Sequence, residues 1–181
     1  MARSVRRTTA ALRPAVTARH LCVSSSSDAV GFVVPYDVKP SPLGGVGIFA
    51  RELIPTGTLV WKMAPNVNCK GITGTEVRSH LASLATAEEK YYFASHIWVG
   101  DGLAWTPLNG DQVDLWNHSN DANIADGSFD GIACKDIPAG GEMLCDYSSF
   151  EYPPWLIDLY HGYSVPYDFI NIKGHIKDQT K

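Results

Sequence analysis

The sequence feature that most constrains this chain is a turn that occurs twice. Residues 54–57 are Ile-Pro-Thr-Gly, and residues 137–140 are Ile-Pro-Ala-Gly. Proline presets φ for a tight turn, and glycine supplies the positive φ that many turns need. Each turn lies between apolar runs, and residues 46–53 and 58–63 around the first turn are predicted to be antiparallel partners. We therefore expect two hairpins built alike, in a fold made of several small sheets.

The predicted helices are short and lie in the middle and near the end of the chain. Apolar residues at helical spacing predict helix over residues 75–95, with a break near Ala85. Thr86 would cap the second half, because Glu89 follows it three residues later. A last helix over residues 155–160 is expected to begin behind two prolines. Two further apolar runs are predicted strands: residues 32–38 and residues 97–105.

The first 28 residues differ from the rest in charge. They contain five arginines and a single carboxylate, Asp28, and they are rich in Ala, Ser and Thr. A basic segment of this composition, without a continuous apolar core, is typical of a mitochondrial or plastid transit peptide. The alternative is a basic disordered leader on a nuclear or cytoplasmic protein. At the other end, residues 166–181 are expected to form a C-terminal tail, largely polar and loose.

The body of the chain is acidic. Residues 1–28 hold five of the 15 basic and one of the 19 acidic residues, so the remainder has a net charge of −8. Direct nucleic-acid binding is not expected, because neutralising phosphates needs clusters of lysine and arginine. An acidic surface suits a basic protein or peptide partner instead. No run approaches the roughly 20 apolar residues of a membrane span, so no membrane segment is expected.

The cysteines do not indicate a metal centre or a disulfide framework. Cys22, Cys69, Cys134 and Cys145 are scattered, with no paired spacing. We interpret those beyond the leader as buried, reduced thiols.

Three segments are richer in glycine and polar side chains than ordinary turns: residues 45–50, 115–123 and 141–147. Gly45 and Gly47 would let backbone groups approach a ligand closely. Alone they favour a plain turn, since neither a phosphate-binding loop nor a dinucleotide fingerprint is complete.

The polar residues of the other two segments are also ambiguous when taken alone. His118 could share a metal with Asp114 four residues earlier, but no further ligands stand at motif spacing, so no metal is predicted. Asn117 and Ser119 could instead stabilise a helix end. Tyr147 could be a core residue, or it could orient a reacting amine.

Taken together and in this order, the three segments resemble those of SET-domain protein lysine methyltransferases. The family has G-x-G-(V/I)-F-A, then N-H-S-x-x-x-N, then G-E-x-L-x-x-D-Y, with an I-P-x-G turn in both usual places. The resemblance spans residues 38–163. It implies a SET domain over residues 29–165: several small sheets, a helical insert at about 75–105, and a knot-like C-terminal threading.

The resemblance also implies site residues and a cofactor, S-adenosyl-L-methionine. Backbone groups of Gly45, Val46 and Gly47 would line the methionine end of the cofactor. Asn117 would bind it by its side chain and His118 mainly by its backbone. The remaining roles implied are these: Tyr147 as the catalytic tyrosine, Cys145 in the substrate channel, and Trp155, Phe150 or Tyr152 stacked on the adenine.

The expected activity is S-adenosylmethionine-dependent methylation of a lysine in a protein or peptide. Two departures qualify the resemblance: the zinc-binding cysteines that follow the domain in histone-type members are missing, and Asp114-Leu115-Trp116-Asn117-His118 is closer to the branch of plant Rubisco large-subunit methyltransferases. Cys145 replaces the usual Phe or Tyr, which suggests that more than one methyl can be added. The alternatives are an inactive SET module that binds a peptide or protein, and a methyltransferase with a non-lysine acceptor. The sequence does not indicate the oligomeric state.

Overall fold

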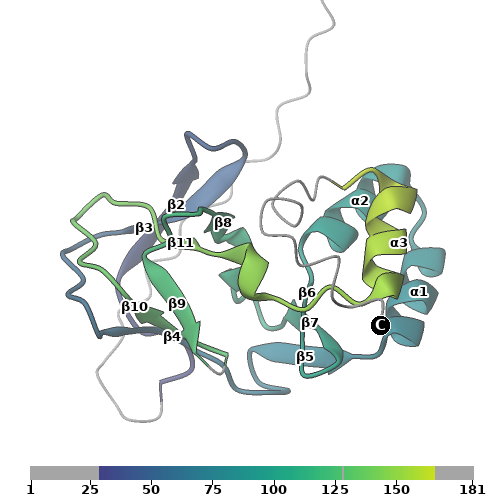
Figure 1. The fold of residues 1–181 in the computed structure, drawn as a ribbon, viewed down its shortest axis with the longest axis horizontal. Helices are drawn as coiled ribbons and strands as arrows, with labels where there is room; N and C mark the ends of the chain where they lie inside the picture. The colour runs from purple at the N-terminus through teal and green to yellow at the C-terminus, as the bar shows by residue number, and fades with distance from the viewer. Residues whose placement is uncertain (1–28, 128, 166–181) are drawn as a thin grey trace, which may run out of the picture.

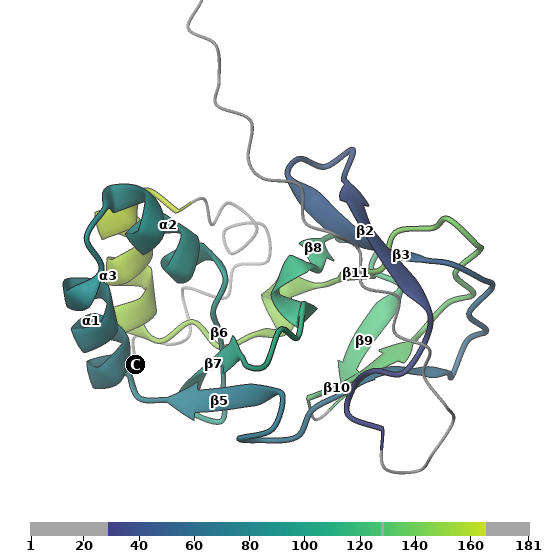
Figure 2. The same ribbon diagram turned by 180° about the vertical axis from the view of Figure 1, so that it is seen from behind.

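The computed structural model describes residues 29–127 and 129–165. The predicted transit peptide and C-terminal tail lie outside these residues. Two lobes are visible in Figures 1 and 2: one is made of strands, and the other carries the three helices against a small sheet. The fold is mainly β with short helices, as the sequence predicts.

The larger sheet joins strands from both halves of the chain. Its order is β1-β4-β10-β9-β11-β8, with antiparallel pairs except for β11, which runs parallel to both β9 and β8. The bounds of these strands are as follows: β1 Gly31–Phe32, β4 Leu59–Lys62, β8 Asn117–His118, β9 Ile124–Gly127, β10 Asp130–Ala133 and β11 Leu144–Cys145.

Two smaller sheets complete the strands. In the first, β2 (Tyr36–Pro40) pairs with β3 (Val46–Ala50). In the second, β7 (Leu103–Pro107) lies between β5 (Cys69–Ile72) and β6 (Trp98–Gly100). The predicted strand over residues 97–105 is therefore a hairpin, bent where the sequence places its glycines.

The two Ile-Pro-x-Gly segments do not close hairpins, and this prediction was wrong. The strand before the first segment, β3, pairs with β2 rather than with β4. The two segments instead pair with each other: Ile54 and Ile137 exchange reciprocal backbone hydrogen bonds of 2.9 Å. Both isoleucines are almost completely buried. Pairing the two segments buries both isoleucine side chains, which exposed hairpin ends would leave in water, while the Pro and Gly residues of the turns stay exposed.

The predicted strand over residues 32–38 is divided into β1 and β2. Pro35 lies at the break and has no N–H to donate to a ladder. The chain turns there, so that β1 joins the large sheet and β2 joins the small one.

The helices follow the predicted capping signals. The break is confirmed: α1 (Gly74–Ser83) ends before α2 (Ala87–Ser95), and Thr86 caps α2 by accepting from the backbone N–H of Glu89 at 3.1 Å. Thr73 and Glu76 form a second capping box at the start of α1. The last helix is confirmed: α3 (Pro154–Tyr163) begins one residue earlier than expected, with Pro153 as its N-cap, and ends three residues later.

Two apolar cores underlie the two lobes. One is built on the large sheet and includes Trp61 and Trp116, whose rings lie edge to face with centroids 6.0 Å apart. The other lies under the helices and includes Leu81 and Leu156. Among the described helices, none is long and apolar enough to cross a membrane.

Candidate functional site

The parallel pairing of β8 with β11 brings the second and third sequence segments side by side. Leu144 lies opposite Asn117, and Cys145 lies opposite His118. Beyond the strands, the Ser119 amide donates to the Cys145 carbonyl at 3.0 Å. This side-by-side course, between residues almost 30 positions apart, is what the predicted knot-like arrangement requires.

Asn123 extends the pairing through its side chain. Its Nδ2 donates to the carbonyl of Glu142 at 2.8 Å, and its Oδ1 accepts from the amide of Leu144 at 2.8 Å. A side-chain amide that both donates and accepts substitutes for one residue of a strand. The last asparagine of the N-H-S-x-x-x-N segment therefore acts as a structural clamp.

Asn117 joins all three segments. Its Nδ2 donates to the carbonyl of Val46 at 3.0 Å and to Oε1 of Glu142 at 2.7 Å. Both N–H groups are thereby used, which leaves Oδ1 as the atom that Asn117 can offer to a ligand. Glu142 in turn accepts from the hydroxyl of Ser41 at 3.0 Å.

The glycines lie where backbone shape and space require them. Gly45 has φ of 62°, in the left-handed region that disfavours other residues. At Gly47, an added Cβ would come within 2.0 Å of Oε1 of Glu142 and 2.9 Å of Nδ2 of Asn117. Only glycine lets β3 approach the Asn117–Glu142 pair so closely.

Tyr147 begins a short 3-10 turn, η2 (Tyr147–Ser149), directly after β11. Its hydroxyl donates to the carbonyl of Trp116, and its amide donates to Nδ1 of His118 at 3.1 Å. Burial raises the pKa of the Tyr147 phenol far above its ordinary value. The tyrosine therefore stays neutral at physiological pH and acts through hydrogen bonds.

Further aromatic residues hold Tyr147 in place. Tyr152 donates its hydroxyl to the Tyr147 carbonyl at 2.7 Å, and Phe150 stacks on the Tyr147 ring with centroids 5.6 Å apart. The His118 ring lies 5.4 Å from the Tyr147 ring. Tyr147 is thus held at its backbone by Tyr152 and at its ring by Phe150 and His118.

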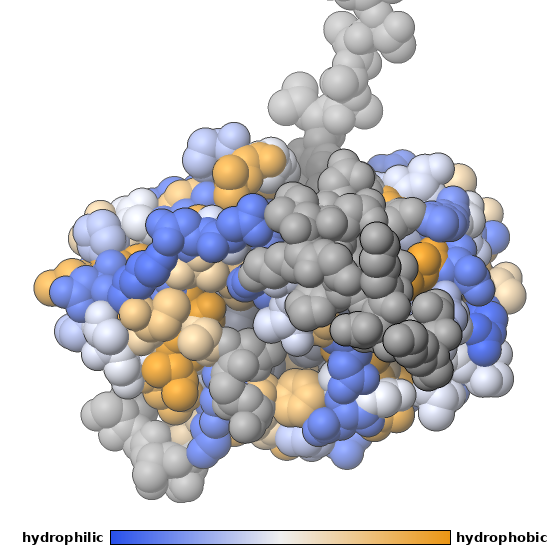
Figure 3. Space-filling model, viewed as in Figure 1, coloured by the Kyte–Doolittle hydropathy of each residue, from blue (hydrophilic) through white to orange (hydrophobic). Residues whose placement is uncertain are grey.

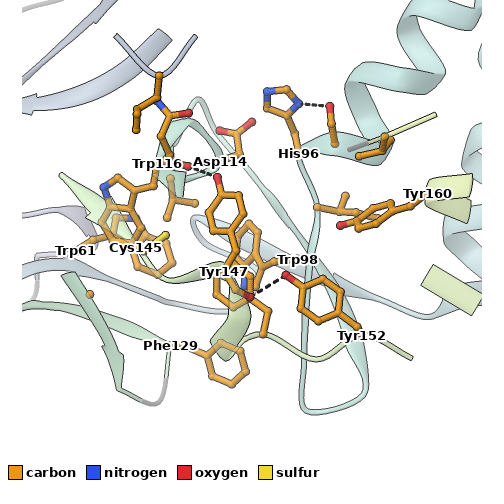
Figure 4. A pocket seen from close by; sticks show the side chains of 18 of the residues that line it. Trp61, His96, Trp98, Asp114, Trp116, Phe129, Cys145, Tyr147, Tyr152 and Tyr160 are labelled. Carbon is orange, nitrogen blue, oxygen red and sulfur yellow. Dashed lines mark hydrogen bonds between the residues drawn. The ribbon is translucent and has the colours of Figure 1, made fainter. Parts of the chain in front are cut away.

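Tyr147 forms part of the wall of a cavity of about 450 Å³ between the two lobes. Asn117, Cys145 and Asp114 also line it, and Figure 4 shows Asp114 near the hydroxyl end of Tyr147. The remaining wall is largely aromatic, formed by Trp61, Trp98, Trp116, Phe129, Phe150 and Tyr152. At one edge lies Leu43, from the exposed turn between β2 and β3, where Figure 3 shows an apolar area.

Asp114 stands out in this aromatic surrounding. It lies in the 3-10 turn η1 (Val113–Leu115) that leads into β8. Burial raises the pKa of its carboxyl to about 6, with a smaller contribution from the charge of Asp111. Among the described residues it forms no ion pair.

The structure brings most of the predicted site residues together. Val46, Gly47 and Asn117 are in contact, with Gly45 next to them in the chain. Tyr147 contacts His118, and Cys145 pairs with His118 between β11 and β8. Of these residues, Asn117, Cys145 and Tyr147 line the cavity.

Trp155 is the exception. Its ring packs on Gly74 at the start of α1, where a Cβ would lie 2.9 Å from the indole, and it is not among the residues that line the cavity. Of the predicted stacking residues, Phe150 and Tyr152 line the cavity instead.

The sequence interpretation missed Glu142 and gave Asp114 no role in the cavity. Glu142 belongs to one of the three motifs, and its neighbour Gly141 was part of the same signal. The cue for Asp114 was a carboxylate between apolar neighbours, Val113 and Leu115. Within residues 29–127 and 129–165, no cluster of three or more His, Cys, Asp or Glu side chains could hold a metal ion.

Comparison with known proteins identifies the family. The SET domain model matches residues 45–148, more than half of the chain, and the chain therefore belongs to the SET-domain family. This is a family of methyltransferases, whose members in general use S-adenosylmethionine and act on proteins.

The other comparisons add little. No curated protein matches the chain. A solved structure from Plasmodium falciparum, named as a candidate histone methyltransferase, is 20% identical, with a TM-score of 0.42 over 67% of this chain and 97% of that one.

Proposed function

We propose that this protein is an S-adenosylmethionine-dependent protein-lysine N-methyltransferase. One observation supports the proposal above all. The Tyr147 hydroxyl is bound to the carbonyl of Trp116, and the next residue, Asn117, is bound to Val46. The predicted catalytic tyrosine and the predicted cofactor residues are thus connected through two hydrogen bonds and the peptide bond between Trp116 and Asn117.

The residues present suit the cofactor. Oδ1 of Asn117 is available to accept from an ammonium or amide group, and the backbone at Gly45–Gly47 can be approached closely. S-adenosylmethionine would supply a methyl group activated on a sulfonium. The carboxylate of Glu142, behind Asn117, adds negative charge that favours a cationic ligand there.

The cavity wall suits the methyl acceptor. Only about one lysine in a thousand is uncharged at neutral pH, from a reference pKa near 10.4. Aromatic walls lower that pKa by removing water from the ammonium. Because the Tyr147 proton is directed to the Trp116 carbonyl, the lone pairs of the hydroxyl oxygen can accept from an amine N–H. Tyr147 would therefore orient the amine, which is what an in-line displacement needs most.

Cys145 sets the width of this wall. Its side chain is buried in β11 and lines the cavity beside Tyr147. A thiol is smaller than the aromatic residue usual at this position, so an amine that already carries a methyl would fit. We expect products with more than one methyl.

The acidic body and the leader suggest the kind of substrate. A net charge of −8 outside residues 1–28 favours a lysine-rich protein segment. If the leader directs import, the substrate is a mitochondrial or plastid protein. A nuclear or cytoplasmic substrate is the alternative.

The experiment is a transfer assay with radiolabelled S-adenosylmethionine and fractionated organelle lysate, with Tyr147→Phe as the matched variant. Mass spectrometry of the labelled band should place the methyl groups on lysine. Label on histidine or on a protein N-terminus would contradict lysine specificity. Cofactor binding without any transfer, across lysates of all compartments, would favour the inactive module.

A further inference from the structure

Asp114 is a partly buried carboxylate that the proposed methyl transfer does not use. Tyr147 orients the amine, and Asn117 with the glycines holds the cofactor. Asp114 lies in the same cavity with no ion pair among the described residues, although a carboxylate in apolar surroundings is costly unless it meets a cation.

Within residues 29–127 and 129–165, the other elements around the cavity do not supply that cation. Its described lining contains neither lysine nor arginine. The titratable groups that line it besides Asp114 are His96, Cys145 and four tyrosines, and Asp111 and Cys69 lie on neighbouring elements. All but His96 are acidic or neutral, and the Nδ1 of His96 contacts the Tyr92 carbonyl at 2.7 Å and the Ser95 hydroxyl at 2.9 Å.

The aromatic wall and the carboxylate have complementary properties. Aromatic faces attract alkylammonium groups, and a carboxylate binds them through charge-assisted hydrogen bonds. Figure 4 shows the Asp114 carboxylate close to the hydroxyl end of Tyr147, where an amine would be oriented.

We propose that Asp114 is the counter-ion that captures the positively charged end of an alkylammonium acceptor in the aromatic cavity. This inference rests on the proposed function, since it names the acceptor of that same site. A lysine side chain enters as an ammonium and pairs with Asp114. It loses its proton only afterwards, because the carboxylate favours the ammonium whereas the aromatic wall around Tyr147 favours the neutral amine. A neutral acceptor of similar length gains no such contact, so the cavity discriminates against it.

The test uses the full chain, with n-butylammonium as a probe that reproduces the end of a lysine side chain and 1-butanol as its neutral counterpart. Binding is followed by saturation-transfer NMR titration at neutral pH. The wild-type protein should bind n-butylammonium about tenfold more tightly than 1-butanol, as expected for one charge-assisted contact. In Asp114→Asn that preference should disappear, while binding of 1-butanol should stay within twofold.

Two variants control the test. Asp158→Asn makes the same change at an exposed position of α3 outside the cavity, and it should keep the wild-type preference. Asp114→Glu keeps the charge and should retain most of the preference for n-butylammonium. An equal preference in wild type and Asp114→Asn, with both proteins folded by circular dichroism, would overturn the proposal.

The probe assay needs neither cofactor nor turnover, so the two proposals can fail separately. A wild-type protein that transfers methyl groups but shows no ammonium preference would remove only the role of Asp114. An intact preference without any transfer would leave the counter-ion in place and contradict the enzyme. With an active protein, Asp114→Asn should raise KM for a lysine peptide more than it lowers kcat.

Discussion

Replacing Asp114 by Asn should stabilise the fold at neutral pH. Burial raises the pKa of this carboxyl from 3.8 to about 6. Since each pKa unit corresponds to about 1.4 kcal/mol, the ionised carboxylate costs the folded state up to about 3 kcal/mol at pH values above both pKa values. An acid whose pKa is raised on folding favours the folded state at low pH, and this contribution is lost as the pH rises through about 6.

The measurement is urea unfolding followed by tryptophan fluorescence at pH 7.5 and at pH 4.5. At pH 7.5, Asp114→Asn should increase the free energy of unfolding by up to about 3 kcal/mol. At pH 4.5, where the native carboxyl is already protonated, the gain should fall to about 1 kcal/mol. Asp158→Asn, at an exposed site, should change neither value appreciably.

A loss of stability in Asp114→Asn at pH 7.5 would mean that the native carboxylate has a stabilising partner. An equal gain at both pH values would mean that ionisation is not the cause. The slope of the free energy of unfolding against urea concentration should be the same as in the wild type. The difference then reports stability rather than a change in the surface exposed on unfolding.

The remaining predictions concern the site, the helices and the leader. Tyr147→Phe should cut the rate of methyl transfer at least tenfold while cofactor affinity changes little, because only the hydroxyl that orients the amine is lost; an equal loss of both, measured by turnover and calorimetry, would contradict the role. Asn117→Ala should weaken cofactor binding at least tenfold by calorimetry, since it removes the amide that joins the three segments; unchanged affinity would contradict this placement. Thr86→Ala should lower the free energy of unfolding by about 1 kcal/mol, because α2 loses its N-cap, whereas Thr86→Ser should restore most of it. Residues 1–28 fused to a fluorescent protein should direct it to mitochondria or plastids in cells; a diffuse or nuclear signal would favour the basic-leader alternative.

Local signals in the sequence predicted the helices well. Thr86 and Glu89 specify a helix start through contacts three residues apart, and Pro153 marks the start of α3 in the same local way. Such signals depend on neighbouring residues only, which is why the break between α1 and α2 could be placed from sequence.

The strand pairing could not be predicted in the same way. Ile54 and Ile137 each have a local hairpin as a plausible partner arrangement, but their hydrogen bonds join residues 83 positions apart. Turn chemistry determines that a bend occurs and not which strands meet across it. The division of residues 32–38 at Pro35 was missed for the same reason, because its two parts pair with different sheets.

The candidate site was predicted in part for a related reason. The motifs indicated Asn117 and Tyr147, and the structure brings both to one cavity. Glu142 and Asp114 gain their importance from neighbours that are distant in sequence, namely Gly47 and the aromatic wall. Trp155 has an aromatic side chain that could stack on a ligand, yet its ring packs directly on Gly74, beside the second core. The missing Cβ of Gly74 leaves the space for the ring.

The most direct test of the account is a calorimetric titration of S-adenosylmethionine into the full chain, with Asn117→Ala as the matched variant. The account predicts saturable binding at one site with micromolar affinity, weakened by the substitution. If a folded wild-type protein shows no heat of binding over the same concentration range, the proposed cofactor is contradicted, and with it the proposed methyltransferase activity.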